Sequence, residues 1–345
     1  MIGWIYSDTR DSEKGRRQKT CGKKIPKIIN KIKEILKYET AGHPISGLKW
    51  TRKTTEKISQ QLQAIDIDIS SNTVCRLLKN MGFSLKVNCK TIESGLRNPP
   101  DPIKRDQQFE FIGHLREQFA RQRLPVISVD TKKKELIGNF KNNGQAWQQK
   151  ATEVYDHDFP TYGVGKAVPY GIYDTQKNTG TVFVGHSSDT PSFAVECIEK
   201  WWKTYGKKNY PKSNSLLILA DAGGSNSYRS RVWKYKLQKQ LCDYHGLSVN
   251  ICHYPPGSSK WNPIEHRLFS EISKNWAGRP LETFETVLKY LRTTKTSTGL
   301  NVKAHYVGKK YKKGERISDK QMKELQLVKH ETLSDWSYKL TPSKM

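Results

Sequence analysis

The sequence has few acidic residues, no closely spaced cysteine pair and no long apolar run. Among 345 residues, 33 Asp and Glu stand against 60 Lys and Arg, a formal net charge of +27. The 6 cysteines form no C-x-x-C pair, which argues against a disulfide framework. No apolar run approaches the roughly 20 residues that span a bilayer, and the apolar stretch in residues 1–6 is too short for a signal-peptide core. We therefore expect a cytoplasmic protein.

The excess of positive charge indicates a polyanionic partner. Each phosphate that a Lys or Arg neutralises releases condensed counterions, so a strongly basic chain favours nucleic acid. Ribosomal or membrane-surface binding would produce the same charge, so this observation sets only the class of partner. The length suggests about two or three domains, enough to bury a sizeable core.

Two apolar runs end directly in an aspartate, and a glutamate opens a later helix. The runs LPVISVD and SLLILAD end in Asp130 and Asp221, and the segment WNPIEH contains Glu265. Short apolar runs are typical of central strands covered on both faces. If the two strands are parallel neighbours, their carboxylates emerge at the same end of the sheet. Three carboxylates there would hold hard divalent cations, and two such metals suit phosphoryl transfer. The trio predicts an enzyme that cuts and joins DNA.

Each carboxylate also has a structural interpretation. An aspartate after a strand is often only a turn-former. Glu265 could cap a helix, because Asn262 suits the N-cap and Pro263 the first helical position. The ordered trio in its strand and helix contexts favours the functional interpretation, and capping does not exclude catalysis.

A helix–turn–helix pattern precedes these strands. Residues 54–65 and the segment after the capping residues 70–72 each place apolar residues on one face, and residues 83–87 alternate like a wing strand. The outward side chains of the second helix are Thr73, Arg76, Lys79 and Asn80. This pattern favours a winged helix–turn–helix that places its second helix in the major groove. The alternative is a small helical domain with a solvated basic face.

We divide the chain at a proline-rich break around residues 98–102. The expected parts are a basic arm with an amphipathic helix (1–40), a helix–turn–helix DNA-binding domain (41–98), a catalytic domain (103–298) and a basic C-terminal tail (299–345). In the catalytic domain the order is strand, hairpin, helix, strand, helix, strand, helix. A first strand that pairs with a hairpin and returns through helices predicts an α/β, ribonuclease-H-like (retroviral-integrase-like) fold.

Further DNA contacts are expected beside the carboxylates. Lys132, Lys133 and Lys134 follow Asp130 and could hold flanking phosphates, although a lysine run is equally a solvated turn. Trp261 could stack on an unpaired base near the cut, although a core position would also suit an aromatic residue.

Five segments, in this order, resemble the DDE transposases of bacterial insertion sequences in the ISAzo-thirteen-like group. They are SVDTKKKELIGNFKN, HDFPTYGVGKAVPYGIYD, ADAGGSNSYRSRVWK, HYPPGSSKWNPIEHRLFSEISKNW and TTKTSTGLNVKA. The resemblance extends from about residue 41 to near the C-terminus. It implies a ribonuclease-H-like domain that uses Mg²⁺ or Mn²⁺, with Asp130, Asp221 and Glu265 as its DDE residues. It also implies double-stranded DNA as partner (element terminal repeats and target), a homo-oligomer on DNA, and association with a bacterial nucleoid.

The expected reaction has two steps. Hydrolysis at the element end frees a 3′-hydroxyl, which then attacks a target phosphodiester in line. Two alternatives stay open at this point. One is a ribonuclease-H-like nuclease without strand transfer, and the other is a catalytically inactive DNA-binding remnant of a transposase.

Overall fold

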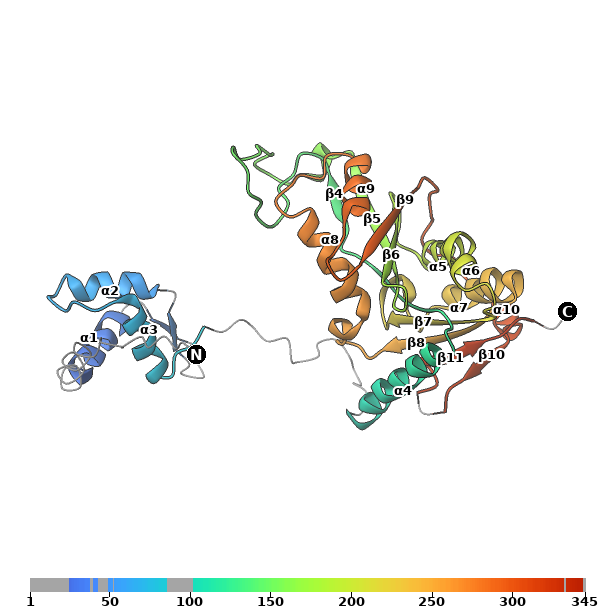
Figure 1. The fold of residues 1–345 in the computed structure, drawn as a ribbon, viewed down its shortest axis with the longest axis horizontal. Helices are drawn as coiled ribbons and strands as arrows, with labels where there is room; N and C mark the ends of the chain where they lie inside the picture. The colour runs from blue at the N-terminus through green and yellow to red at the C-terminus, as the bar shows by residue number, and fades with distance from the viewer. Residues whose placement is uncertain are drawn as a thin grey trace, which may run out of the picture. The chain divides into compact units, whose positions relative to one another are not determined.

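The structure, a computed structural model, describes residues 25–37, 40–42, 49–51, 53–85, 102–331 and 333–343. It divides the chain into two compact units, residues 1–92 and 93–345 (Figure 1). None of the helices described is long and apolar enough to cross a membrane.

In its described residues, the smaller unit contains three helices and a short hairpin. They are α1 (Ile25–Lys37), β1 (Thr40–Gly42), β2 (Lys49–Thr51), α2 (Thr55–Gln63) and α3 (Ser71–Asn80). The apolar faces of the helices form one core that includes Ile32, Ile58, Leu62 and Val74. The amphipathic helix and both helices of the predicted helix–turn–helix pattern are therefore present.

Side-chain caps begin the two later helices of this unit. The hydroxyl of Thr54 accepts a hydrogen bond from the backbone N–H of Lys57 at 3.2 Å, and that of Ser70 from the N–H of Thr73 at 3.3 Å. Such caps satisfy backbone donors that the first helical turn leaves free. The expected wing does not appear in residues 83–85, which form no strand, and residues 86 and 87 lie outside the described residues.

The larger unit is built on a mixed sheet. In spatial order its strands are β10 (Leu327–Lys329), β11 (Ser337–Leu340), β8 (Ser248–Tyr254), β7 (Ser215–Asp221), β3 (Val126–Thr131), β5 (Gly165–Asp174), β6 (Thr179–Gly185) and β9 (Asn301–Val307), and β4 (Glu135–Ile137) pairs with β5. Strands β3, β7 and β8 are parallel neighbours, whereas β3 is antiparallel to β5 of the β5–β6 hairpin. This arrangement agrees with the ribonuclease-H-like fold expected from the sequence.

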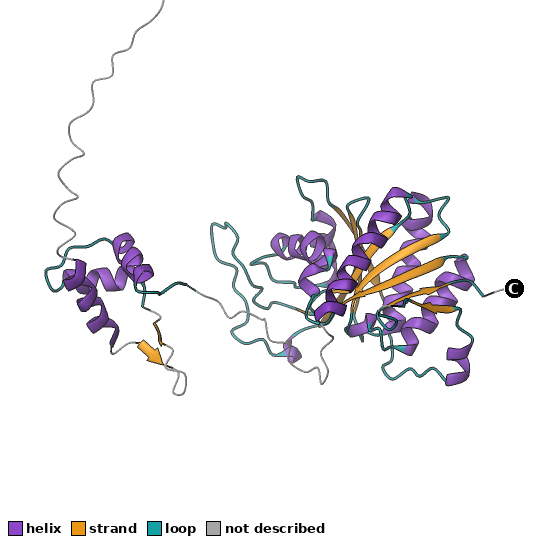
Figure 2. Cartoon of the chain, turned by 90° about the horizontal axis from the view of Figure 1, so that it is seen from below, coloured by secondary structure: helices purple, strands orange, loops and turns teal. Residues whose placement is uncertain are grey.

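Helices cover both faces of this sheet (Figure 2). One face packs against α5 (Pro191–Trp201), which continues as a π-helix (Trp202–Gly206), and α7 (Arg231–Leu237), which continues as a π-helix (Gln238–Asp243). The other face packs against α4 (Pro102–Arg121), α8 (Ser270–Asn275) and α9 (Phe284–Thr293). Short helices α6 (Lys207–Asn209) and α10 (Asp319–Lys323) complete the unit. A sheet covered on both faces explains why β3 and β7 read as nearly continuous apolar runs.

The basic C-terminal part is not the tail expected for residues 299–345. Strand β9 pairs in parallel with β6 along its whole length, and β11 pairs with β8. Val302 and Ala304 are buried, whereas Asn301 and Lys303, which alternate with them, are exposed. Alternation of this kind needs few apolar residues because only one face of an edge strand is covered. The interpretation of this segment as a tail was therefore wrong.

Candidate active site

Asp130 and Asp221 lie side by side where two parallel strands end. Val129 of β3 pairs with Ala220 of β7, so an aspartate follows at the equivalent position of each strand. Side chains alternate between the faces of a sheet. Because Val129 and Ala220 belong to the core under α5 and α7, both aspartates project to the opposite face.

Glu265 reaches the same end of the sheet from a helix that lies on that face. It begins a π-helical segment, Glu265–Phe269, which continues as α8; together they form the Glu265 helix. Gly171 of β5 pairs with Asp130, and a Cβ there would stand only 2.5 Å from Phe269 Cε1. Gly180 of β6 likewise leaves room for Leu268. Two residues without side chains thus let this helix approach the hairpin beside Asp130.

A buried hydrogen-bond network joins the three elements that carry the carboxylates. Asn262 donates from Nδ2 to Asp221 Oδ1 at 2.8 Å, and its Oδ1 accepts a hydrogen bond from the hydroxyl of Ser128 in β3. The same hydroxyl accepts from the backbone N–H of Ile264, at 3.1 Å. Ser128 and Asn262 are both 0% exposed. The side chain of Asn262 therefore orients Asp221 instead of capping the helix.

The pKa values show that the carboxylates act on one another. Burial, then the charge of Asp221, raises the pKa of Asp130 to about 8, with smaller contributions from Glu265 and Asp189. Burial also raises the pKa of Asp221, while the hydrogen bond from Asn262 opposes this. The pKa of Glu265 is raised by burial and by Asp221. A pKa of about 8 favours the protonated form of Asp130 at neutral pH, and its carboxyl also hydrogen-bonds to Glu265.

The donor chemistry of this site fits a hard divalent cation. Carboxylate oxygens are the ligands that Mg²⁺ and Mn²⁺ prefer, and a cation beside a carboxylate lowers its pKa. In the part of the chain that the structure describes, no three His, Cys, Asp or Glu side chains are spaced to hold one ion together. Asp130, Asp221 and Glu265 lie at one end of the sheet, and the charge of Asp221 raises the pKa values of the other two, but the three do not form a closed cluster of ligands.

A fourth carboxylate, Asp189, was missed by sequence reasoning. Its Oδ1 accepts a hydrogen bond from the hydroxyl of Thr131, next to Asp130, at 3.1 Å. Its Oδ2 lies 3.9 Å from Lys134 Nζ. Asp189 belongs to the loop between β6 and α5, and no apolar run or motif marks it. Only the pairing of β6 with β5 brings that loop to this end of the sheet.

An open cleft of about 550 Å³ borders the two aspartates. Its lining residues are Asp130, Asp221, Ala222, Gly223, Gly224, Ser227, Tyr228, Arg229, Pro255, Pro256 and Gly257. The cleft thus combines the ends of β3 and β7 with the loops that follow β7 and β8. Such loops beyond the carboxyl ends of strands are where open α/β sheets bind ligands.

The lysines expected to contact DNA behave differently from one another. Lys132 is only 8% exposed, forms an ion pair with Glu135 at 3.2 Å and lies over the ring of Trp276. Burial and the ion pair leave the ammonium group of Lys132 little exposed, and DNA contact by Lys132 remains a prediction. Lys133 and Lys134 are exposed and line a separate hollow beside β4.

The other predicted contact residues are accessible. Trp261 is 60% exposed, with its ring 6.2 Å from that of Phe109 in an edge-to-face contact. On α3, Arg76, Lys79 and Asn80 are exposed, whereas Thr73 is half-buried. Arg76, Lys79 and Asn80 are accessible as predicted, Thr73 is less accessible than expected, and DNA contact by these residues remains a prediction.

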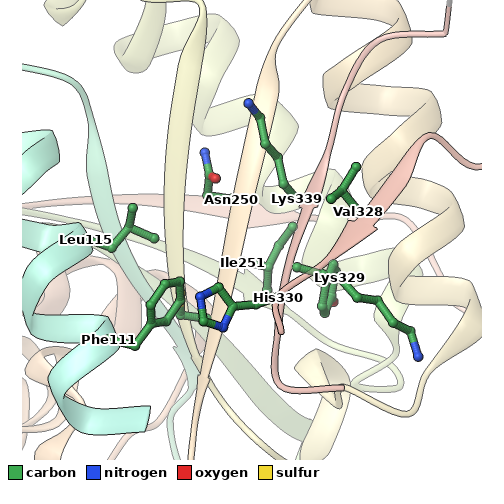
Figure 3. Close-up of a pocket in the computed structure, with 10 residues that line it drawn as sticks. Phe111, Leu115, Asn250, Ile251, Val328, Lys329, His330 and Lys339 are labelled. Carbon is green, nitrogen blue, oxygen red and sulfur yellow. The ribbon is translucent and has the colours of Figure 1, made fainter. Parts of the chain in front are cut away.

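Another hollow, of about 130 Å³, lies between α4 and strands β8, β10 and β11 (Figure 3). The rings of Phe111 and His330 contact each other at its edge in a tilted arrangement, with centroids 3.8 Å apart. Lys329 and Lys339 contribute to its rim, and none of the described residues that line it is a carboxylate. It therefore lacks the chemistry of the cleft beside Asp130.

One protein family matches most of this chain, and solved structures are similar to it at low sequence identity. Two solved structures are similar in part: a "Mos1 transposase paired-end complex with left transposon end" and a "Mos1 Strand Transfer Complex". The first structure is 14% identical in sequence to this chain and has a TM-score of 0.40. The alignment covers 82% of this chain and 74% of the chain in that structure. The second structure is 13% identical and has a TM-score of 0.41, and its alignment covers 76% of this chain and 68% of its own chain. No curated protein matches. The family described as the Rhodopirellula transposase DDE domain matches residues 31–342, so the chain belongs to this ISAzo-thirteen-like family of DDE transposases.

Proposed function

We propose that this transposase cuts DNA at the ends of an insertion sequence and joins the freed 3′-hydroxyl to target DNA. The observation that carries the proposal is the placement of Asp130, Asp221 and Glu265 on one face, at one end of the sheet, beside an open cleft. Both reactions displace an oxygen at a phosphodiester, first with water and then with the 3′-hydroxyl as nucleophile. One site can therefore serve both.

Asp130, Asp221 and Glu265 would hold Mg²⁺ or Mn²⁺. Such cations would stabilise the attacking and leaving oxygens of an in-line displacement. Asp130 must give up its proton for this, which the charge of a cation favours. Asn262 holds Asp221 in one orientation, so one ligand is positioned before DNA enters. A ligand oriented in advance needs less rearrangement during the reaction.

The smaller unit would supply recognition of the element ends. We infer that it acts as a winged helix–turn–helix with α3 in the major groove, where Arg76 and Asn80 can reach base edges. Lys79, Lys133 and Lys134 would contact phosphates, and Trp261 would stack on an unpaired base. The partner would be double-stranded DNA of the terminal repeats and of the target. Two ends must be joined together, so we expect a homo-oligomer on DNA.

A strand-transfer assay tests this function. Purified protein is incubated with Mg²⁺, a target plasmid and a labelled duplex that ends in the inverted repeat found beside its own gene. We expect nicking at the repeat and a covalent joint product, both lost in Asp130→Asn, Asp221→Asn and Glu265→Gln. DNA affinity of Asp130→Asn should be unchanged or slightly higher, because one acidic group fewer repels phosphate.

The assay separates the alternatives. Nicking without any joint product, even from a pre-cleaved end, would indicate a nuclease. Binding with neither reaction would indicate an inactive remnant. Loss of binding in Asp130→Asn, in parallel with loss of cleavage, would mean that Asp130 is structural.

A further inference from the structure

We propose that Arg229, held in place by Tyr228, binds a DNA phosphate in the cleft beside Asp130 and Asp221. This inference rests on the proposed function, because it names the group that receives the substrate there. Among the described residues that line the cleft, Arg229 is the only cation, facing a site that also contains two aspartates. A phosphodiester that approaches those aspartates meets repulsion, which a fixed positive charge in the same cleft offsets.

The guanidinium of Arg229 is oriented by its neighbour. Its Nε donates a hydrogen bond to the hydroxyl of Tyr228 at 2.8 Å, and its Cζ lies 5.1 Å from the centre of the tyrosine ring. That ring is itself packed edge-to-face against His253 and Trp336, at 6.2 and 6.0 Å. Tyr228 is therefore a positioning residue.

The charge of Arg229 is available to a ligand. Within the described parts of the chain no carboxylate forms an ion pair with it, whereas Arg231, two residues later, pairs with Asp319 at 2.5 Å. Donation from Nε to Tyr228 uses one of five N–H groups. The two terminal nitrogens remain as the planar fork that matches two oxygens of a phosphate.

The loop after β7, which carries Tyr228 and Arg229, is held to the buried part of the unit through Asn226. Asn226, 1% exposed, accepts a hydrogen bond from the hydroxyl of buried Tyr170 at 2.9 Å. Its backbone carbonyl lies 2.8 Å from Nε2 of buried His253, within hydrogen-bond distance. Anchoring at Asn226 fixes the turn that presents Arg229. It also means that Arg229 is not simply a solvated arginine on a loose loop.

The same loop leaves room for a DNA backbone. A Cβ added at Gly223 or Gly224 would meet nothing within 4 Å, and Gly224 has a φ of +67°, which favours glycine. The side of the cleft between the aspartates and Arg229 therefore lacks side-chain bulk. A phosphate between the aspartates and the guanidinium would have access from this side.

The salt dependence of binding tests the inference. We would measure the affinity of the full chain for the terminal-repeat duplex, in EDTA, at several salt concentrations. Each phosphate contact contributes about 0.9 to the slope of log K against log [salt]. Arg229→Ala should lower this slope by about 0.9, whereas Arg229→Lys, which keeps the charge, should leave the slope unchanged but reduce cleavage. Tyr228→Phe keeps the ring and removes only the hydroxyl, so it should also reduce cleavage more than affinity.

Arg121→Ala is the matched control. It removes the same charge from the end of α4, before β3 begins and away from the cleft. Among the described residues, the one ion pair of Arg121 is an exposed pair with Glu117. Slopes and cleavage rates that are the same in Arg229→Ala as in Arg121→Ala, with unchanged melting temperatures, would overturn the inference. Because binding is measured without cleavage, a wild-type protein that cuts nothing would count against the proposed function while the slope still decides the role of Arg229.

Discussion

Asn262 donates a hydrogen bond from Nδ2 to Oδ1 of Asp221 at 2.8 Å, although the two residues lie 41 positions apart in the chain. Asn262 also accepts from the hydroxyl of Ser128, one strand further along the sheet. One buried amide thus ties β3, β7 and the start of the Glu265 helix together. Buried networks of this kind hold their members rigidly when every partner is satisfied.

Removal of that amide should affect both stability and cleavage. Asn262→Ala leaves the hydroxyl of Ser128 without its acceptor and Asp221 without its donor, so we expect a loss of about 1–3 kcal/mol in the free energy of unfolding. Cleavage should fall further than this loss explains. Urea unfolding and the nicking assay measure the two effects. Asn142→Ala, which loses one hydrogen bond to the carbonyl of Trp276, is the control, and equal effects of both variants on cleavage would contradict the orienting role.

Gly171→Ala should displace the Glu265 helix. The new methyl group would stand 2.5 Å from Phe269 Cε1 and 2.9 Å from Ile264 Cδ1, and overpacking of this kind costs about 1–3 kcal/mol. We expect a lower melting temperature and a large loss of cleavage. Gly113→Ala in α4 meets nothing within 4 Å and should stabilise the chain, by up to about 1 kcal/mol. Cleavage by Gly171→Ala at the wild-type rate would mean that the helix does not need this close approach.

Stability without divalent cations should fall as pH rises. The folded protein holds the pKa of Asp130 at about 8, against about 3.9 for an aspartate in an unfolded chain. Between these values the folded state keeps a proton that the unfolded state has lost, so stability is lost as pH increases through this window. Asp130→Asn removes the effect. In EDTA, the melting temperature of Asp130→Asn should therefore be higher than that of the wild type. The difference should be largest at pH 9 and smallest near pH 4. A difference independent of pH would contradict this assignment.

Divalent cations should stabilise the folded chain through the same carboxylates. Free Mg²⁺ or Mn²⁺ at 100 times its dissociation constant would add about 2.7 kcal/mol to the free energy of unfolding. We expect a rise in melting temperature with Mn²⁺ that Asp221→Asn largely abolishes. Glu117→Gln, an exposed acid on α4, is the control and should keep the full rise. Equal rises in all three proteins would place the bound cation elsewhere.

Recognition and chemistry should be separable. The exposed side chain of Arg76 on α3 belongs to the smaller unit, and the carboxylates to the larger one. A bidentate contact to a base discriminates by about 1–3 kcal/mol, so Arg76→Ala should reduce the preference for terminal-repeat DNA over random DNA while non-specific nicking with Mn²⁺ persists. Competition binding measures this preference. Equal weakening for both DNAs would mean that Arg76 contacts phosphate.

Most elements of the larger unit could be predicted because their patterns are local. The strands that carry Asp130 and Asp221 are apolar on both faces, and the β5–β6 hairpin shows apolar runs around a polar turn. Strand β9 was missed since it has few apolar residues among lysine-rich neighbours. Its place is decided by β6, whose free edge supplies seven pairing positions.

The candidate site was predictable only in its charged members. Asp130, Asp221 and Glu265 stand out because each sits at the end or the beginning of a recognisable element. Ser128 and Asn262 carry no such signal, although a polar residue inside an apolar strand is unusual. The burial of Lys132 was not predictable from the lysine run, because its charge indicated a solvated side chain, whereas its ion pair with Glu135 lies in a buried position.

The sequence by itself determined the alternation of apolar and polar residues, and with it the strands, the helices and the excess of positive charge. It determined the type of each element because hydrophobic periodicity is a property of neighbouring residues. Only the tertiary structure decided that β3 and β7 are parallel in a register that aligns Asp130 with Asp221, that Asn262 turns toward Asp221, and that Arg229 faces the same cleft. Those relationships depend on strand pairing and packing between distant segments, for which no local pattern of residues carries a signal.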